Sequence, residues 1–138
     1  MVFRTLYLLL KCGKEYGHQT LGGATFNDTA HIICAYVYLH EECSQDDIVQ
    51  ALRIDKTTVA KSLQGLETKG YVLRTQDRRD RRKNVLRLTE CGRESITEII
   101  AIYQNWIQNV MGVLSPEEQK QFEEYSQRMY SAAQNLLQ

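Results

Sequence analysis

Residues 52–94 read LRIDKTTVAKSLQGLETKGYVLRTQDRRDRRKNVLRLTECGRE, and they contain the patterns that are most informative about the fold. The first part of this stretch predicts a helix over residues 56–69. Val59, Leu63 and Leu66 recur there at i, i+4 and i+7, so they form one apolar face. The other face of the same helix is polar. The pattern is that of a surface helix packed on a core by one side only.

A second short helix is expected just before this one. The segment SQDDIVQALR, residues 44–53, opens with Ser44 and has Asp47 three residues later, which is a capping-box pattern. The turn that follows ends in Asp55, a suitable N-cap for the next helix, and Gly70 closes that helix as a C-terminal glycine. Two short helices joined by so short a turn predict a helix-turn-helix.

The second half of the stretch combines two β-rich runs with a basic turn. The runs are YVLRT (71–75) and NVLRLT (84–89), and QDRRDRRK (76–83) lies between them. Residues 75–89 hold five Arg and one Lys against two Asp. We therefore expect a two-stranded hairpin with a cationic tip. A helix-turn-helix followed by such a hairpin is a winged helix.

Helices are also expected on both sides of this region, over residues 2–16, 28–41, 89–114 and from Pro116 to the end, with a loop at 18–27. Their expected N-caps are Asn27, Thr89 and Ser115, and Glu118 completes a capping box with Ser115. The first and the long later helix are apolar over wide arcs, which include Phe3, Leu6, Tyr7, Leu10 and much of 96–114. Such faces predict a helical homodimer interface.

The expected fold is therefore mainly α with a small β-hairpin, a winged helix-turn-helix with long terminal dimerisation helices in a single domain. Residues 1–26 would form the N-terminal dimerisation helix and loop, 27–88 the winged helix-turn-helix, and 89–138 the C-terminal dimerisation helices.

Charge is strongly segregated along a chain whose formal net charge is zero. Residues 53–87 carry eleven Lys or Arg against four Asp or Glu, a net charge of +7, whereas the segments before and after it carry −3 and −4. An isolated basic run is often only a solvated loop. Here the helix face and the hairpin point to the same surface, which indicates binding to double-stranded DNA.

The residues expected to contact DNA lie on the second short helix and on the tip. Opposite the apolar face, Thr57, Lys61, Gln64 and Thr68 have the chemistry to read base edges, and Thr58 and Ser62 at the margins can reach phosphates. At the tip, Arg78, Arg79, Arg81, Arg82 and Lys83 suit a narrow minor groove, and Asp80 can hold one Arg in a bidentate pair.

This stretch resembles the signature region of the MarR family of bacterial and archaeal regulators. The family pattern is a capped recognition helix, a Leu-Glu-x-Lys-Gly turn, an Asp-Arg-Arg wing and a Leu-Thr-x-x-Gly helix start. Here these read Leu66-Glu67-Thr68-Lys69-Gly70, Asp80-Arg81-Arg82 and Leu88-Thr89-Glu90-Cys91-Gly92. The match covers about a third of the chain, and the helix order extends it more weakly over the full length.

The resemblance implies a homodimer whose first and last helices interlock. It also implies a recognition helix in the major groove and a wing in the minor groove of a near-palindromic operator. By position, Arg82 matches the wing-tip Arg of the family and Asp80 the Asp that steadies it. The usual activity is repression relieved by a small molecule or an oxidant. Arg78, Arg79 and Lys83 make this wing more basic than most.

Two kinds of effector are consistent with the sequence. Tyr7, Tyr16, Tyr36, Tyr38, His18 and His31 are candidates to line a pocket for a small aromatic or phenolic molecule, although tyrosines at helical spacing are also typical of a core. Cys12 lies beside Lys11 and Lys14, which favour a reactive thiolate, so a thiol-based redox-sensing repressor is the alternative. A buried structural thiol is the simpler interpretation.

Other function classes find little support. The pairs His31-x-x-Cys34 and His40-x-x-Cys43 lie nine residues apart, on opposite sides of a straight helix, so no metal site is expected. No cofactor and no enzymatic motif are expected. The N-terminal apolar run is too short to span a bilayer, which predicts a cytoplasmic protein with no membrane partner. The rival interpretations are a winged-helix protein-interaction module without DNA binding and a small enzyme that uses this fold.

Overall fold

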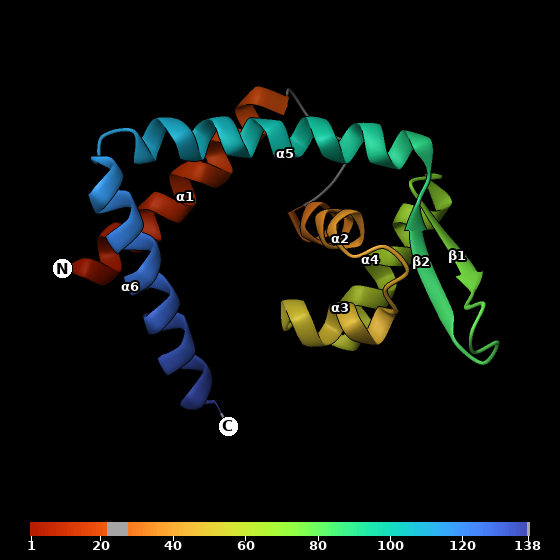
Figure 1. The fold of residues 1–138 in the computed structure, drawn as a ribbon. Coiled ribbons are helices and arrows are strands. Elements are labelled where there is room, and N and C mark those ends of the chain that lie inside the picture. The colour runs from red at the N-terminus through yellow and green to blue at the C-terminus, as the bar shows by residue number, and fades with distance from the viewer. Residues whose placement is uncertain (22–27, 138) are drawn as a thin grey trace. The chain divides into compact units, whose positions relative to one another are not determined.

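The computed structural model describes residues 1–21 and 28–137 of the chain. The described elements are α1 (Val2–Leu21), α2 (Asp28–Leu39), α3 (Gln45–Leu52), α4 (Lys56–Thr68), β1 (Val72–Gln76), β2 (Asn84–Leu88), α5 (Glu90–Met111) and α6 (Pro116–Asn135) (Figure 1). They form two compact units, Met1–Tyr103 and Gln104–Gln138. The mainly α fold with one small hairpin confirms the fold class that the sequence predicts.

The boundary of the first helix differs from the prediction. Residues 18–21, expected to begin a loop, continue α1 to Leu21, and the Thr20 hydroxyl donates to the Tyr16 carbonyl at 2.8 Å. Gly17, which favours a stop at residue 16, is instead buried inside the helix, where a Cβ would lie 2.5 Å from Tyr103 Oη, so this glycine permits close packing and does not end the helix. The remainder of the expected loop and the Asn27 cap lie outside the described residues. The second helix, α2, ends at Leu39, two residues before its expected end at residue 41.

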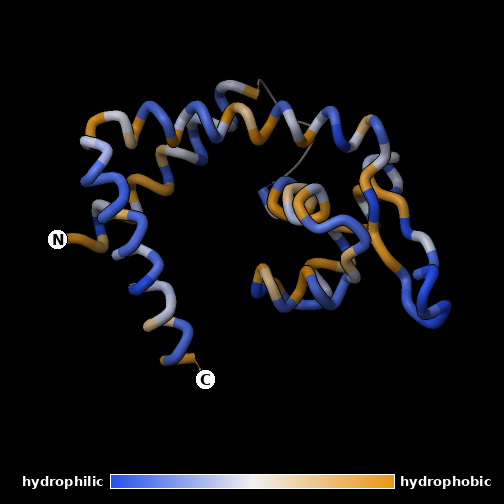
Figure 2. Tube along the Cα trace, in the orientation of Figure 1, coloured by the Kyte–Doolittle hydropathy of each residue, from blue (hydrophilic) through white to orange (hydrophobic). Residues whose placement is uncertain are grey.

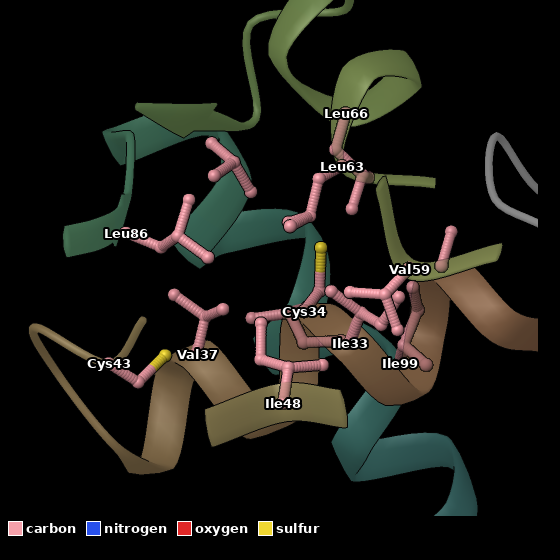
Figure 3. Close-up of a cluster of buried hydrophobic side chains, with 13 residues drawn as sticks. Ile33, Cys34, Val37, Cys43, Ile48, Val59, Leu63, Leu66, Leu86 and Ile99 are labelled. Atoms are coloured by element: carbon pink, nitrogen blue, oxygen red, sulfur yellow. The ribbon is translucent and has the colours of Figure 1, made fainter. Parts of the chain in front are cut away.

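The core of the first unit lies where α2, α3, α4, the hairpin and the first half of α5 meet. Its fully buried side chains include Ile33, Cys34, Val37, Ile48, Val59, Leu63, Leu66, Leu86 and Ile96. Figure 3 shows side chains of α4 pointing towards those of α2, with Ile48 on the α3 side of the cluster. The apolar face predicted for α4 is confirmed by this packing.

Capping fixes the helix-turn-helix. Ser44 and Asp47 form the expected capping box, in which the Ser44 N–H donates to Asp47 Oδ2 at 2.7 Å and the Asp47 N–H donates to Ser44 Oγ at 3.1 Å. Arg53 ends α3 in the left-handed region, with φ 52°. Asp55 then caps α4, accepting from the Thr58 N–H at 2.8 Å. These caps confirm the predicted starts of both helices.

The hairpin has the predicted strands and a partner that the sequence did not reveal. β1 and β2 pair antiparallel from Val72 opposite Leu88 to Gln76 opposite Asn84. On its other side, the Leu86 N–H donates to the Cys43 carbonyl at 2.8 Å in a single bridge. A one-residue bridge has no alternating pattern, so sequence periodicity cannot predict it. It attaches the hairpin to the turn before α3.

The junction between the hairpin and α5 explains the Leu-Thr-x-x-Gly motif. The Thr89 hydroxyl donates to the Gly70 carbonyl at 2.6 Å and accepts from the Gly92 N–H at 2.9 Å. Gly70 has φ +74°, a conformation that favours glycine. A Cβ on Gly92 would lie 2.1 Å from the Tyr71 carbonyl oxygen. The motif therefore joins both ends of the hairpin to the start of α5.

The second unit contains the end of α5 and all of α6. Ser115 caps α6 in a capping box with Glu118, and Pro116 occupies the first turn, as predicted. The Gln119 side-chain amide donates to the Met111 and Leu114 carbonyls at 3.1 and 3.0 Å, which closes the turn after α5. α5 ends at Met111, three residues before the expected end. No residue of α6 is buried in the single chain.

Candidate DNA-binding interface

The polar face of α4 is exposed over its whole length. Thr57, Lys61, Gln64 and Thr68 are all exposed, and Thr58 and Ser62 at its margins are half-buried. The helix is held from the opposite side, because Val59, Leu63 and Leu66 are buried in the core. The structure thus presents the predicted set of side chains on one surface.

Two of the threonine hydroxyls on this helix already donate hydrogen bonds. Thr58 Oγ1 donates to Asp55 Oδ2 at 2.6 Å, and Thr68 Oγ1 donates to the Gln64 carbonyl at 2.8 Å. Their oxygens remain acceptors, but their protons serve the helix itself. The side chains of Lys61 and Gln64 are therefore the donors that best suit an external acceptor such as a base edge or a phosphate.

Two aspartates organise the backbone of the wing tip, which is the hydrophilic end of the hairpin in Figure 2. Asp77 Oδ1 accepts from the Arg79 N–H at 2.7 Å, and Asp80 Oδ1 accepts from the Arg82 N–H at 3.0 Å. The bidentate pair expected between Asp80 and an arginine side chain is therefore replaced by a bond to backbone. An aspartate two residues before its N–H partner forms a tight local turn, and this local bond wins over a flexible guanidinium.

The arginines of the strands and of the tip differ in their partners. On the strands, Arg74 pairs with Glu67 and Arg87 pairs with Glu42. At the tip, no carboxylate among the described residues lies within 4 Å of the guanidinium groups, and these belong to Arg78, Arg79, Arg81 and Arg82. The tip thus keeps a net positive charge whose guanidinium groups form no ion pair among the described residues, as suits a contact with a polyanion.

A groove connects the wing to the start of the helix-turn-helix. Its volume is about 450 Å³. Its lining residues are Ser44, Gln45, Asp46, Asp47, Lys56, Arg74, Arg82, Lys83 and Asn84. Sequence reasoning missed Gln45, Lys56 and Arg74, whose roles depend on contacts between elements. Both signs of charge meet here, since Lys56 Nζ lies 3.5 Å from Asp46 Oδ1.

The cysteines divide into two classes. Cys34 and Cys43 are buried, and burial raises the pKa of the first thiol to about 12 and of the second to about 11. Cys12 and Cys91 are exposed. The lysines beside Cys12 pair with carboxylates, Lys11 with Glu15 at 3.8 Å and Lys14 with Asp28. They are therefore less available to stabilise a thiolate than the sequence suggested.

In the described part of the chain, four of the aromatic candidates lie in two different places. Tyr7 and His18 line a pocket of about 560 Å³ along α1, together with Leu10, Lys11, Lys14 and Glu15. Tyr36 and Tyr38 instead pack against the core, and the ring of Tyr36 lies 4.3 Å from that of His40. No cluster of three potential metal ligands is present among residues 1–21 and 28–137. In the same residues, no helix is long and apolar enough to cross a membrane.

Known proteins resemble both the sequence and this arrangement. A model of the MarR family matches residues 25–83. The uncharacterized HTH-type transcriptional regulator YdgJ of Bacillus subtilis is 30% identical over 131 residues, which are 95% of this chain and 80% of that protein. The S. aureus MepR–DNA complex has a TM-score of 0.84 at 25% identity and covers 96% of this chain and 98% of that one. The crystal structure of MarR has a TM-score of 0.79 at 24% identity and covers 99% of this chain and 92% of that one. This chain belongs to the MarR family of winged-helix, DNA-binding transcriptional regulators.

Proposed function

We propose that this protein is a cytoplasmic, homodimeric repressor that binds a near-palindromic DNA operator and leaves it when a small aromatic or phenolic molecule binds. The observation that carries the proposal is the pairing of two surfaces in one unit. The exposed polar face of α4 and the arginines of the wing tip, which form no ion pair among the described residues, both belong to residues 1–103. One is suited to a major groove and the other to a minor groove.

In this proposal each surface has a separate task. Lys61 and Gln64 read base edges, with Thr57 and Thr68 beside them, whereas Thr58 and Ser62 contact phosphates through their oxygens. Arg82 enters the minor groove, and Arg78, Arg79, Arg81 and Lys83 attract the phosphate backbone. Asp80 holds the Arg82 backbone through its 3.0 Å hydrogen bond, so it positions the inserted residue.

The exposed apolar face of α1 supports the dimer, and one solved neighbour supports the effector. α1 exposes Phe3 and Leu10, and a twofold axis would present two copies of α4 to half-sites about one helical turn apart. One solved neighbour at 23% identity, Bordetella bronchiseptica BpsR, is described as regulated in DNA binding by 6-hydroxynicotinic acid, a small aromatic acid. MepR is described in complex with DNA. We extend both properties to this chain as part of the proposal.

Two variants separate the tasks of helix and wing. The probe is a duplex selected by the wild-type protein from a random-sequence pool. Gln64→Ala should weaken binding by roughly 1–3 kcal/mol and relax the preference at one base pair. Arg82→Ala should weaken binding to all duplexes more evenly and reduce the slope of log affinity against log salt by about one unit for each lost contact.

Titrations of selected and scrambled duplex at several salt concentrations measure both effects. Thr97→Ala is a suitable control, because Thr97 is exposed on α5 and its hydroxyl donates to the Arg93 carbonyl within that helix. If both test variants bind like the wild type at every salt concentration, the assigned surface is wrong. A wild type that selects no sequence from the pool would contradict the proposed function itself.

A further inference from the structure

Arg74 joins three elements at the edge of the candidate interface. Its Nε lies 3.0 Å from Glu67 Oε1 and its Nη2 lies 3.5 Å from Glu67 Oε2, while its Nη1 donates to Gln45 Oε1 at 3.4 Å. Arg74 is in β1, Glu67 is in the last turn of α4, and Gln45 is the first residue of α3. One guanidinium therefore ties the wing to both helices of the helix-turn-helix.

The Arg74–Glu67 pair is better protected from solvent than the other ion pairs of the described residues. The side chains of Arg74 and Glu67 are 32% and 29% exposed, lower as a pair than in any of the other six. Its two-pronged geometry also fixes direction, because both oxygens of Glu67 face the planar guanidinium. Such a pair restricts orientation more than a flexible surface contact does.

Arg74 lies at a position in the hairpin where it can fix the orientation of the wing. The root of the hairpin is held at Gly70 by the Thr89 hydroxyl, and β2 is held at Leu86 by Cys43. Arg74 is opposite Leu86 in the strand register, so it adds a tie on the β1 side at the same level. Beyond this level, no ion pair connects the tip to the rest of the described chain. The angle between the wing tip and α4 is therefore set at the level of Arg74 and Leu86.

We propose that Arg74 and Glu67 are positioning residues for DNA recognition, which hold the wing tip at a fixed angle to the exposed face of α4. This inference rests on the proposed DNA-binding function. With the angle fixed, the wing and the helix can contact neighbouring grooves of one duplex at once. Without the fixed angle, the tip samples many directions, and the protein loses part of the DNA affinity that it gains from the link between the wing and α4.

Glu67→Ala tests this inference, because the two explanations predict opposite changes in DNA affinity. Removing a negative charge near a DNA surface raises affinity if electrostatics alone matters. Loss of the tie should instead weaken binding to the selected duplex about fivefold or more, which corresponds to at least about 1 kcal/mol. Glu42→Ala is the matched control, since it also removes one acid and frees one strand arginine, Arg87. It should bind like the wild type or tighter.

The link to the wing is tested by combining variants. Glu67→Ala should flatten the salt dependence as Arg82→Ala does. The double variant should bind about as weakly as Arg82→Ala alone, because an undirected wing has already lost most of the Arg82 contact. Effects that simply add would overturn the inference, and so would binding by Glu67→Ala equal to or tighter than that of the wild type.

A second substitution keeps the test decisive if Glu67→Ala does not fold, as judged by circular dichroism. Arg74→Lys keeps the charge but offers a point charge instead of the two-pronged contact. It should weaken binding and show the same lack of additivity with Arg82→Ala, and wild-type affinity would overturn the inference. If the wild type selects a duplex but these variants match it, only this inference fails. If the wild type selects none, the proposed function fails as well.

Discussion

Three carboxylates accept hydrogen bonds from backbone N–H groups at helix starts, and their ionisation is linked to folding. The Asp47 pKa is lowered chiefly by the Ser44 N–H, and the Glu118 pKa by the Ser115 N–H. The Asp55 pKa is lowered first by the Thr58 hydroxyl and then by the Thr58 N–H. Each hydrogen bond is stronger to the charged carboxylate, so each cap weakens in acid.

Asp55→Asn should make the protein less sensitive to acid. Because the folded-state pKa of Asp55 lies below its ordinary 3.8, its ionised form stabilises the fold fully above that value. This stabilisation is lost as the pH falls through the lowered pKa. Asparagine caps helices well but does not titrate. Urea unfolding should therefore show similar midpoints near neutral pH and a smaller loss below about pH 4 in the variant. Equal losses in both proteins would contradict this.

Residue roles that depend on local spacing were predictable, whereas roles between elements were not. The caps at Ser44, Asp55 and Ser115 involve partners three residues away, so the sequence shows both members. Arg74 and Gln45 are 29 residues apart, and nothing in the sequence connects them. The partner predicted for Asp80, an arginine side chain, was wrong, because a charge pattern does not show that a backbone N–H lies closer than a side chain.

At the level of elements, the contact between the start of α5 and the residue after Gly70 permits no side chain at Gly92. A Cβ there would lie 2.1 Å from the Tyr71 carbonyl oxygen, which belongs to the backbone and cannot turn aside. At Gly65, on the exposed face of α4, a Cβ would meet nothing within 4 Å. The same substitution should therefore have opposite effects at these two glycines.

Gly92→Ala should lower the free energy of unfolding by about 1–3 kcal/mol or more, because the strand and helix must separate to admit the methyl group. Gly65→Ala should raise it by roughly 0.5–1 kcal/mol, because alanine loses less backbone freedom in a helix interior. Denaturant unfolding of both variants beside the wild type measures these changes. Destabilisation of equal size at both positions would mean that the close approach at Gly92 is not the cause.

The elements themselves were largely predictable because hydrophobic spacing and capping agree along the chain. Both hairpin strands and the helices from α3 to α6 begin within one residue of their expected positions. Helix ends were less certain, since α1 runs to Leu21 and α5 stops at Met111. Helix ends depend on how the last turn packs, and the one-residue bridge at Cys43 depends on tertiary contact alone.

At the scale of the whole molecule, the terminal helices expose more apolar surface than a single chain explains. In α1, Phe3 is 87% and Leu10 74% exposed. In α6, which has no buried residue, Tyr125 and Met129 are more than half exposed. A helix that buries nothing contributes little stability of its own in water. A second copy of the chain would give these faces a partner, and it would also supply the second recognition helix that the proposed near-palindromic operator requires.

The wild type should sediment at micromolar concentration with twice the 16.0 kDa mass of the chain. Leu10→Asp should shift it towards the monomer and lower its melting temperature, although Leu10 contributes little to the core of a single chain. Lys11→Ala is a control at an exposed polar neighbour, whose ion pair in the described part of the chain is with Glu15 within the helix. A monomeric wild type whose melting temperature is unchanged by Leu10→Asp would rule out the homodimer, because an exposed leucine on a stable monomer can be replaced at little cost. Loss of operator binding together with dimerisation would show that DNA recognition requires both copies.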